Sequence, residues 1–598
     1  MISKQLNQTL RKFRLVQSQG PVLVLSAVVG LIGGSGAVGF HYLLHFFQEY
    51  ILGTLVGFEL FGGQSELAII PRWLFFLVPA IGGLLSGFLV FMLAPETQGH
   101  GTDAMINTFH NNSGRVRKRV PFVKAITSIL TISTGGSAGY EGPVAQIGSG
   151  LGATLSRGFK ISAKFRRNLT LAGTAAGLGA IFKAPLGGAL TSVEVLYKED
   201  FESDAFLSSI IASVVAYATY CSFMGYAPFF EQFGSMPSFI SENPTELVFY
   251  SLFGIMMAPL SLLYVKTFYV IRDGFRNIKA PIWIKPGIGG LGVGILFYIQ
   301  PNIIAGGWQF LVECIRSPEP SYSFAILLLS IAFLKIIATS LTVGSGGSGG
   351  VFGPSLFIGG MFGGAFGVTL DMLFPSLISH PGAFMIVGMG AFFSGAANAP
   401  IASVVMVCEL TGNYNLLAPL MLASVIHVFL AHKWSIYENQ VLNKFHSKAH
   451  KSEINIDILR GALVKDVIDR TAEIVRVHPE DTLKQLEHFM SQTDEDLFIV
   501  DNDEGKMVGI LDVHAIRKSI FDQSVSSLVI VEDMMFPPKY LGQTMDLHAA
   551  SQYFLKTGIS QLPVINHQKE VIATLRHADV IKSYDSLVRK GSLPTKKL

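Results

Sequence analysis

The sequence has little charge for its length. Only 15% of its 598 residues are Asp, Glu, Lys or Arg, whereas 50% are hydrophobic and the mean hydropathy is +0.46. Ordinary soluble domains are about 25% charged. So low a charge excludes a disordered chain, a coiled coil and most soluble multi-domain enzymes. It predicts a protein that crosses a lipid bilayer several times.

Cysteine is also scarce. The three cysteines, Cys221, Cys314 and Cys408, lie far apart in apolar stretches and form no metal-binding or redox spacing. This excludes a disulfide framework and predicts inert, buried thiols. The sequence contains no nucleophile–base constellation and no cluster of metal ligands. We therefore expect a protein that is not an enzyme and has no metal or resident cofactor.

The few charges are unevenly placed. The first 450 residues hold 47 charged side chains and the remaining 148 hold 40, so the tail has the composition of a soluble domain. The body sums to +7 and the tail to −4, which gives no signal for nucleic-acid binding. We predict a membrane body followed by a soluble tail.

Composition divides the chain further. We predict a basic cytoplasmic segment at 1–19, a membrane domain at 20–440, a linker at 441–462 and a terminal tail at 591–598. The apolar stretch after residue 20 is too long for a cleavable signal peptide and predicts the first membrane helix. The short basic segment favours a bacterial inner membrane, with the soluble tail in the cytoplasm.

The membrane domain contains two repeats, at about 20–225 and 246–440. A glycine, an Ala-Pro pair and a glutamate recur at one offset of 215 residues, so that Gly173, Ala184-Pro185 and Glu194 match Gly388, Ala399-Pro400 and Glu409. Matched interruptions of membrane helices in two halves predict a transporter-type site between them.

The tail contains two units of its own, at 463–525 and 526–590. Each unit alternates short β runs with amphipathic helices, and the strands are expected at 498–500, 508–511, 562–565 and 571–575. This pattern predicts a tandem α/β module.

Two Gly-rich runs, 135–139 and 344–350, carry the functional prediction. Each leads into an apolar segment with a proline in its first turn, Pro143 or Pro354. A helix N-terminus has free N–H donors and about half a positive charge. Two such termini facing each other inside a membrane would bind a small anion weakly enough to release it. The sequence therefore predicts transport of a small anion.

Glu141 lies two residues after the first run, in Gly139-Tyr140-Glu141-Gly142-Pro143. A carboxylate among these amides would mimic the permeant anion and compete for its place, and protonation would open the path. A carboxylate that only caps a helix is the alternative.

Five motifs, in order along the chain, resemble those of the CLC family of chloride channels and proton–chloride exchangers. They are Gly139-Tyr140-Glu141-Gly142-Pro143, Ala184-Pro185, Gly349-Gly350-Val351-Phe352-Gly353-Pro354, Glu409-Leu410-Thr411-Gly412 and Ser435-Ile436-Tyr437. The resemblance covers about 20–440, and the tail resembles the paired CBS domains of many CLC proteins.

The resemblance implies an α-helical polytopic fold with an inverted repeat and broken helices, a homodimer, and a separate anion pathway in each subunit. It implies that Glu141 is the gate. It also implies that six positions line the anion path: Gly139, Tyr140, Gly142, Val351, Phe352 and Tyr437. For Tyr437, an interfacial aromatic anchor is the alternative.

Two departures from the family pattern lie beside the anion path. His100 stands where the family has a serine whose hydroxyl contacts the anion; its imidazole would donate one N–H, and a side chain that makes no contact is the alternative. Asp103 in the same loop is expected to cap a helix. Tyr140 replaces the basic residue that precedes the gating glutamate.

A third departure concerns proton coupling. Val195 stands where exchangers of the family carry a proton-transferring glutamate, so the sequence favours channel-like conduction, with proton-coupled antiport of chloride as the alternative. The adjacent Glu194 is a candidate for the proton pathway, together with Glu141. Its match to Glu409 in the second repeat favours a structural role instead.

Other functions stay open at this point. CBS pairs also occur on divalent-cation transporters, but residues 321–430 contain only two carboxylates, Asp371 and Glu409. A nucleotide-sensing membrane scaffold is a further alternative. The CBS pair itself either binds an adenine nucleotide, with Asp579 holding the ribose, or is structural and dimerising.

Overall fold

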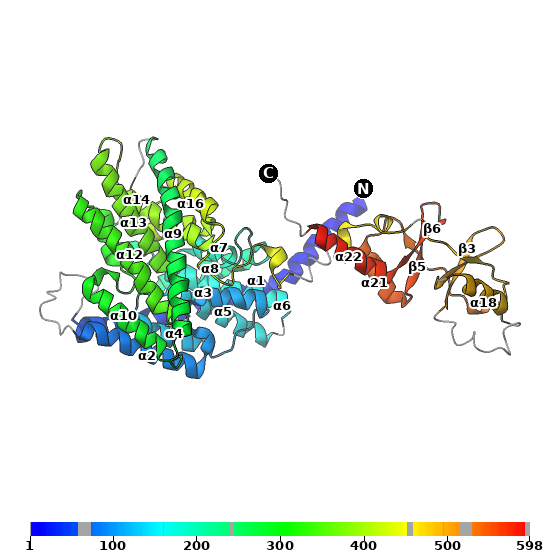
Figure 1. Cartoon of the computed structure of the whole chain (residues 1–598), viewed down its shortest axis with the longest axis horizontal. Coiled ribbons are helices and arrows are strands. Elements are labelled where there is room, and N and C mark those ends of the chain that lie inside the picture. The colour runs from blue at the N-terminus through cyan, green and yellow to red at the C-terminus, as the bar shows by residue number, and fades with distance from the viewer. Residues whose placement is uncertain are drawn as a thin grey trace. The chain divides into compact units, whose positions relative to one another are not determined.

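The computed structural model describes residues 2–57, 73–159, 161–237, 239, 244–450, 459–469, 471–493, 495–513 and 529–591. The chain forms two compact units, Met1–Ala449 and His450–Leu598 (Figure 1). Much of the expected linker at 441–462 and nearly all of the tail at 591–598 lie outside the described residues.

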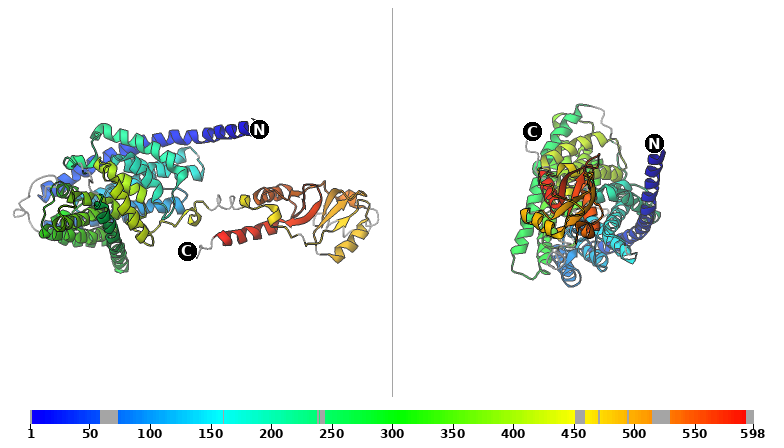
Figure 2. Two further views of the ribbon diagram at one scale, coloured as in Figure 1. Left: turned by 90° about the horizontal axis from the view of Figure 1, so that it is seen from above. Right: turned by 90° about the vertical axis from the view of Figure 1, so that its right-hand side faces the viewer.

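The first unit is helical. Its first half contains α1 (Ile2–Gln48), the π-helix η1 (Glu49–Leu55), α2 (Leu74–Leu93), α3 (Gly101–Asn111), α4 (Val120–Ser133), α5 (Glu141–Gly158), α6 (Ala163–Ile181), α7 (Pro185–Glu194) and α8 (Ser203–Met224). Its second half contains α9 (Glu246–Asn277), α10 (Lys285–Ile299), α11 (Trp308–Arg316), α12 (Tyr322–Gly344), α13 (Phe352–Leu373), α14 (Pro381–Ala397), α15 (Pro400–Thr411) and α16 (Leu417–Ala431). Helix α1 begins at Ile2, so the basic segment at 1–19 is helical and its first turns project from the bundle (Figure 2).

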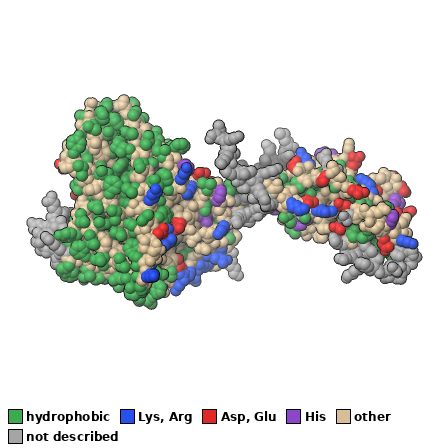
Figure 3. Space-filling model, viewed as in Figure 1, with side chains coloured by type: hydrophobic (Ala, Val, Ile, Leu, Met, Phe, Trp, Pro, Cys, Tyr) green, Lys and Arg blue, Asp and Glu red, His purple; other side chains and the backbone are tan. Residues whose placement is uncertain are grey.

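Apolar side chains cover the outside of this unit. Among the described residues, six helical stretches are long and apolar enough to cross a membrane: Gly20–Leu55, Leu74–Leu93, Ser203–Phe233, Glu246–Asn277, Tyr322–Gly344 and Phe352–Leu373. Figure 3 shows that hydrophobic side chains dominate the visible face of the unit, while charged ones are few on it. The prediction of a multi-pass membrane protein is confirmed.

Closely packed glycines mark the internal repeat. A Cβ on Gly148 of α5 would collide with the carbonyl of Gly173 in α6, and a Cβ on Gly173 would collide with the carbonyl of Gly148. Gly359 of α13 and Gly388 of α14 make the same reciprocal approach. The α5–α6 pair therefore recurs as α13–α14, and the predicted repeat is confirmed.

The breaks between helices recur as well. The apolar stretch near 170–196 is interrupted between α6 and α7, where Lys183 has φ +52°; Asn398 between α14 and α15 has φ +51°. The alanine that follows each of them has non-helical backbone, because the next residue is proline and disfavours helical backbone before it. A left-handed residue followed by Ala-Pro thus ends one helix and starts the next.

The second unit contains two similar small sheets. The first consists of β1 (Arg476–Val477), β2 (Leu497–Asp501) and β3 (Met507–Asp512), and the second of β4 (Leu541–Gly542), β5 (Gln561–Ile565) and β6 (Val571–Arg576). In each sheet the first two strands are parallel and the last two antiparallel. In the described part of this unit, four α-helices accompany the sheets: α18 (Leu483–Gln492), α20 (Val531–Met534), α21 (Leu547–Thr557) and α22 (His577–Gly591). The predicted tandem α/β module is confirmed.

Candidate functional site

Three glycine loops pair with one another in the helical unit. His100 forms a parallel bridge with Gly349, and Gly139 forms an antiparallel bridge with Gly350. The N–H of Gly139 donates to the carbonyl of Gly350 at 2.9 Å. The loops lead into α3, α5 and α13, so the starts of three helices converge. Free N–H donors and the positive ends of helix dipoles gather there, as an anion site requires.

The backbones of the three loops are in direct contact. A Cβ on Gly142 would lie 2.8 Å from the Cα of Gly350, 3.1 Å from the carbonyl oxygen of Gly349 and 3.3 Å from the nitrogen of Gly101. Any side chain at Gly142 would force the loops apart. Glycine at this position is therefore a requirement of the close approach.

The carboxylate of Glu141 occupies the start of α13. Glu141 is the first residue of α5 and only 1% exposed, and its Oε1 accepts a hydrogen bond from the N–H of Gly353. Its Oε2 is buried and has no hydrogen-bond partner in the described part of the chain. The carboxylate thus binds the first turn of a helix in the other repeat, where a permeant anion would bind.

The donor in this contact is one residue beyond the predicted pair. Val351 is the N-cap of α13 and Phe352 its first residue, and both are buried. The first four N–H groups of a helix have no partner within it, so Gly353 is as eligible as its neighbours. Sequence reasoning named Val351 and Phe352 and missed Gly353, although the same rule covered it.

His100 and Tyr437 lie together beside the glycine loops. Their ring centroids are 5.6 Å apart, and the Nδ1 of His100 is buried with no hydrogen-bond partner among the described residues. Tyr437 is 2% exposed, and its hydroxyl lies close to the side chain of Thr102 in the first turn of α3. So buried a tyrosine is no interfacial anchor.

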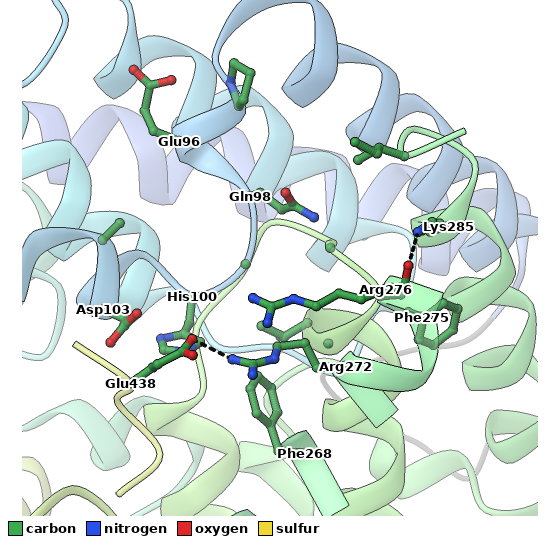
Figure 4. Close-up of a pocket in the computed structure, with 18 of the residues that line it drawn as sticks. Glu96, Gln98, His100, Asp103, Phe268, Arg272, Phe275, Arg276, Lys285 and Glu438 are labelled. Atoms are coloured by element: carbon green, nitrogen blue, oxygen red, sulfur yellow. Dashed lines mark hydrogen bonds and ion pairs between the residues drawn. The ribbon is translucent and has the colours of Figure 1, made fainter. Parts of the chain in front are cut away.

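A pocket of about 490 Å³ reaches His100 (Figure 4). Six charged side chains line it: Glu96, Asp103, Arg272, Arg276, Lys285 and Glu438. Arg272 pairs with Glu438 at 2.6 Å beside His100. A pocket lined by charged side chains therefore reaches the imidazole.

Asp103 differs from its prediction. His100 is the N-cap of α3 and makes no side-chain capping bond, while the carboxylate of Asp103 accepts from the backbone N–H of Asn439 at 2.8 Å and from its Nδ2 at 2.6 Å. Asp103 fastens the segment that carries Tyr437 onto α3. The distance in sequence between them hides this contact.

Two buried lysines related by the repeat were not predicted as site residues. The Nζ of Lys124 donates to the carbonyls of Thr97 and Gly99 at 3.0 and 2.7 Å, and that of Lys335 to Ile303 and Ala305 at 2.8 and 2.6 Å. Both lysines are 0% exposed. When protonated, Lys124 adds positive potential near His100, and Lys335 adds it near Glu141. Their shared offset of 211 residues, the offset between Gly148 and Gly359, was the available signal.

Glu194 and Glu409 cap each other's repeat. The carboxylate of Glu194 in α7 accepts from the N–H groups of Ile401 and Ala402 at 3.1 and 2.6 Å, at the start of α15. That of Glu409 in α15 accepts from Leu186 and Gly187 at 3.2 and 2.7 Å, at the start of α7. This reciprocal capping favours the structural alternative for Glu194 over a place in a proton pathway.

The tail offers less to a ligand. Asp579 lies in α22 with its side chain 39% exposed, and pairs with Lys582 at 3.5 Å. The corresponding segment in the first α/β repeat of the tail begins near residue 514, and part of it lies outside the described residues. Within the described residues, no three His, Cys, Asp or Glu side chains are grouped as metal ligands would be. Nucleotide binding at Asp579 stays a prediction.

Comparisons with known proteins agree with this geometry. Residues 82–432 match the protein family described as "Voltage gated chloride channel", and residues 464–522 and 529–586 each match the CBS domain. The chain is 30% identical over 418 residues to the H(+)/Cl(-) exchange transporter ClcA of Vibrio parahaemolyticus, which covers 69% of this chain and 86% of that protein.

Two solved structures are similar in fold. One, a slow cyanobacterial Cl-/H+ antiporter, matches with a TM-score of 0.60 and 24% identity, over 69% of this chain and 94% of that chain. The other, a eukaryotic CLC transporter, matches with a TM-score of 0.56 and 19% identity, over 93% of this chain and 97% of that chain.

Proposed function

Because the chain belongs to the voltage gated chloride channel (CLC) family, we propose that it exchanges chloride or a similar small anion for protons across a membrane. Each subunit of a homodimer contains its own pathway. The bacterial relative supports a bacterial inner membrane, with the CBS pair on the cytoplasmic side. The CBS pair is a structural or nucleotide-binding accessory to transport.

Antiport replaces channel-like conduction as the favoured mechanism. Val195 cannot carry a proton, which favoured a channel, but the relative that is 30% identical is an exchanger. The carboxylate of Glu194 is engaged by two N–H groups of α15. Proton coupling in this chain therefore rests on Glu141.

The contact between Glu141 and α13 is the single observation that carries the proposal. A charged carboxylate and a chloride ion compete for the same N–H of Gly353. When Glu141 takes up a proton, its carboxyl is a weaker acceptor and carries no charge, so chloride displaces it. When the proton leaves, the carboxylate returns and expels the anion. Each cycle thus links proton uptake to anion binding.

The anion reaches this site through the pocket and past His100. Helix dipoles, the N–H of an imidazole and the hydroxyl of Tyr437 attract an anion without a direct lysine or arginine contact. Interactions of this strength permit release as well as binding. The buried lysines supply long-range attraction and keep their own N–H groups on carbonyls.

The test is chloride efflux from proteoliposomes with proton movement recorded in the same sample. We expect a chloride gradient to drive protons uphill in the wild-type protein. We expect Glu141→Ala to abolish proton movement and to retain chloride flux. The matched control is Glu313→Gln, an exposed glutamate of α11, which should leave both unchanged. Chloride flux without proton movement in the wild-type protein would favour channel-like conduction over antiport. The absence of anion flux in folded protein would favour the membrane scaffold.

A further inference from the structure

Aromatic side chains enclose Glu141 on a side that the pocket does not reach. We call Tyr140, Phe182, Phe229 and Trp308 the aromatic cover; none of them lines the pocket at His100. Their rings are in sequential contact, with centroids 5.9 Å apart for Tyr140 and Phe182, 5.6 Å for Phe182 and Phe229, and 5.9 Å for Phe229 and Trp308. The cover separates the carboxylate from solvent in this direction.

The cover is assembled from four segments. Tyr140 precedes α5, Phe182 ends α6, Phe229 begins the short helix η3 (Phe229–Phe233), and Trp308 begins α11. The exposed fractions of Phe182, Phe229 and Trp308 are 1%, 3% and 6%. A charged group that moved into this space would meet a dry, apolar surrounding, which is costly unless a donor awaits it.

The indole of Trp308 lies beside the carboxylate. A Cβ on Gly353 would lie 3.0 Å from Cζ2 of Trp308, 2.9 Å from Oε1 of Glu141 and 3.2 Å from its Oε2. The Nε1 of Trp308 is buried and has no acceptor in hydrogen-bond geometry, although the Tyr140 hydroxyl is close to it. The Cζ2 edge of the indole thus faces the carboxylate; among the described residues, the indole N–H has no acceptor and Oε2 of the carboxylate has no donor. Buried polar groups are rarely left in this condition unless a function uses them.

We propose that the indole N–H of Trp308, assisted by the Tyr140 hydroxyl, receives the protonated carboxyl of Glu141 when an anion takes its place on α13. This inference rests on the proposed function of Glu141 as the competing anion. On displacement the carbonyl oxygen of the carboxyl exchanges the N–H of Gly353 for the N–H of Trp308. Both donors of the cover are neutral, so they hold the neutral carboxyl weakly, and it returns to α13 when the proton and the anion leave. Trp308 is therefore a positioning residue of the gate.

The decisive variant is Trp308→Phe, measured in two backgrounds. Phenylalanine keeps an aromatic ring in the cover and removes the N–H. In the wild-type background we expect the maximal rate of chloride transport to fall about tenfold, as for a buried carboxyl that loses one hydrogen bond. The chloride concentration for half-maximal flux should change less than about twofold. In the Glu141→Ala background, which has no carboxylate to receive, Trp308→Phe should change nothing.

Two companion variants separate this role from packing. Tyr140→Phe should slow transport in the same direction and less, and Trp73→Phe, at an exposed tryptophan before α2, should have no effect. An equal slowing by Trp308→Phe with and without the Glu141 carboxylate would overturn the proposal, since it would indicate contact with the anion or simple packing. An unchanged rate in the wild-type background would overturn it too. If Glu141→Ala alone did not abolish proton movement while chloride flux continued, the proposed function, and not only this inference, would be wrong.

Discussion

The reciprocal caps of Glu194 and Glu409 give the most direct test of how the two repeats are joined. Glu194→Gln keeps one oxygen acceptor for the N–H groups of Ile401 and Ala402 and removes the second oxygen and the charge. A hydrogen bond to a charged group contributes about 1.5–3 kcal/mol, and a charge at a partly buried helix end up to about 2 kcal/mol. We therefore expect the free energy of unfolding to fall by about 2–4 kcal/mol.

Glu409→Gln should act in the same way, because it removes the same two-bond cap from α7. Its effect should be smaller, since Glu194 is 5% exposed and Glu409 is only partly buried. The assay is thermal unfolding in detergent, together with chloride and proton flux in liposomes. Both variants should melt earlier and keep the wild-type ratio of protons to chloride.

A proton-carrying role for Glu194 would give a different result. If Glu194→Gln removed proton movement while the melting temperature and chloride flux stayed at wild-type values, Glu194 would be a proton carrier and its cap incidental. Glu313→Gln, which removes an exposed charge from α11, is the control for surface effects. A fall in stability for Glu409→Gln alone would show that the two repeats are not joined symmetrically.

Three further predictions concern the approach to the site and its buried charge. Glu438→Gln should remove one of the two carboxylates that pair with Arg272 at the pocket, the other being Asp273. It should lower the half-saturating chloride concentration about two- to fivefold, because exposed ion pairs are worth only about 0–1 kcal/mol; Arg272→Gln should raise it, as the concentration dependence of flux would reveal. Lys335→Met should lower the free energy of unfolding by about 3–5 kcal/mol, since two buried carbonyls lose a charged donor, and thermal unfolding measures this. His100→Ser should shift the ratio of chloride to nitrate flux by up to about tenfold; an unchanged ratio would place His100 outside the path.

Much of the fold followed from sequence because its signals repeat. The glutamates at an offset of 215, the Ala-Pro pairs and the glycine runs all mark positions where the structure breaks or packs helices. Helix α11 was not predicted, and α3 was indicated only by the expected cap at Asp103, since both helices are short and not apolar along their whole length. Periodicity and hydropathy respond to long membrane helices and pass over short ones.

The site was harder to predict because its contacts join distant segments. Glu141 was found from its motif, but the donor that it meets, Gly353, belongs to the other repeat. The approach of Trp308 to the carboxylate depends on the path of α11, which no local pattern specifies. The tie between Asp103 and Asn439 is likewise a product of tertiary packing, whereas a local propensity suggested only a cap.

The two kinds of buried charge also differ in when, during synthesis, they find partners. Each buried lysine binds carbonyls that precede it by 25–32 residues, so each repeat supplies hydrogen-bond acceptors for its own lysine as it leaves the ribosome. Glu141 and Glu194 instead await N–H groups more than 200 residues downstream. The first repeat therefore waits in the bilayer with two carboxyls that lack these donors, and the arrival of the second repeat brings donors to both. A chain that stops after α8 would therefore keep two acidic side chains without their donors, and charged carboxylates in this state are costly in a bilayer. Association of the two repeats removes this cost.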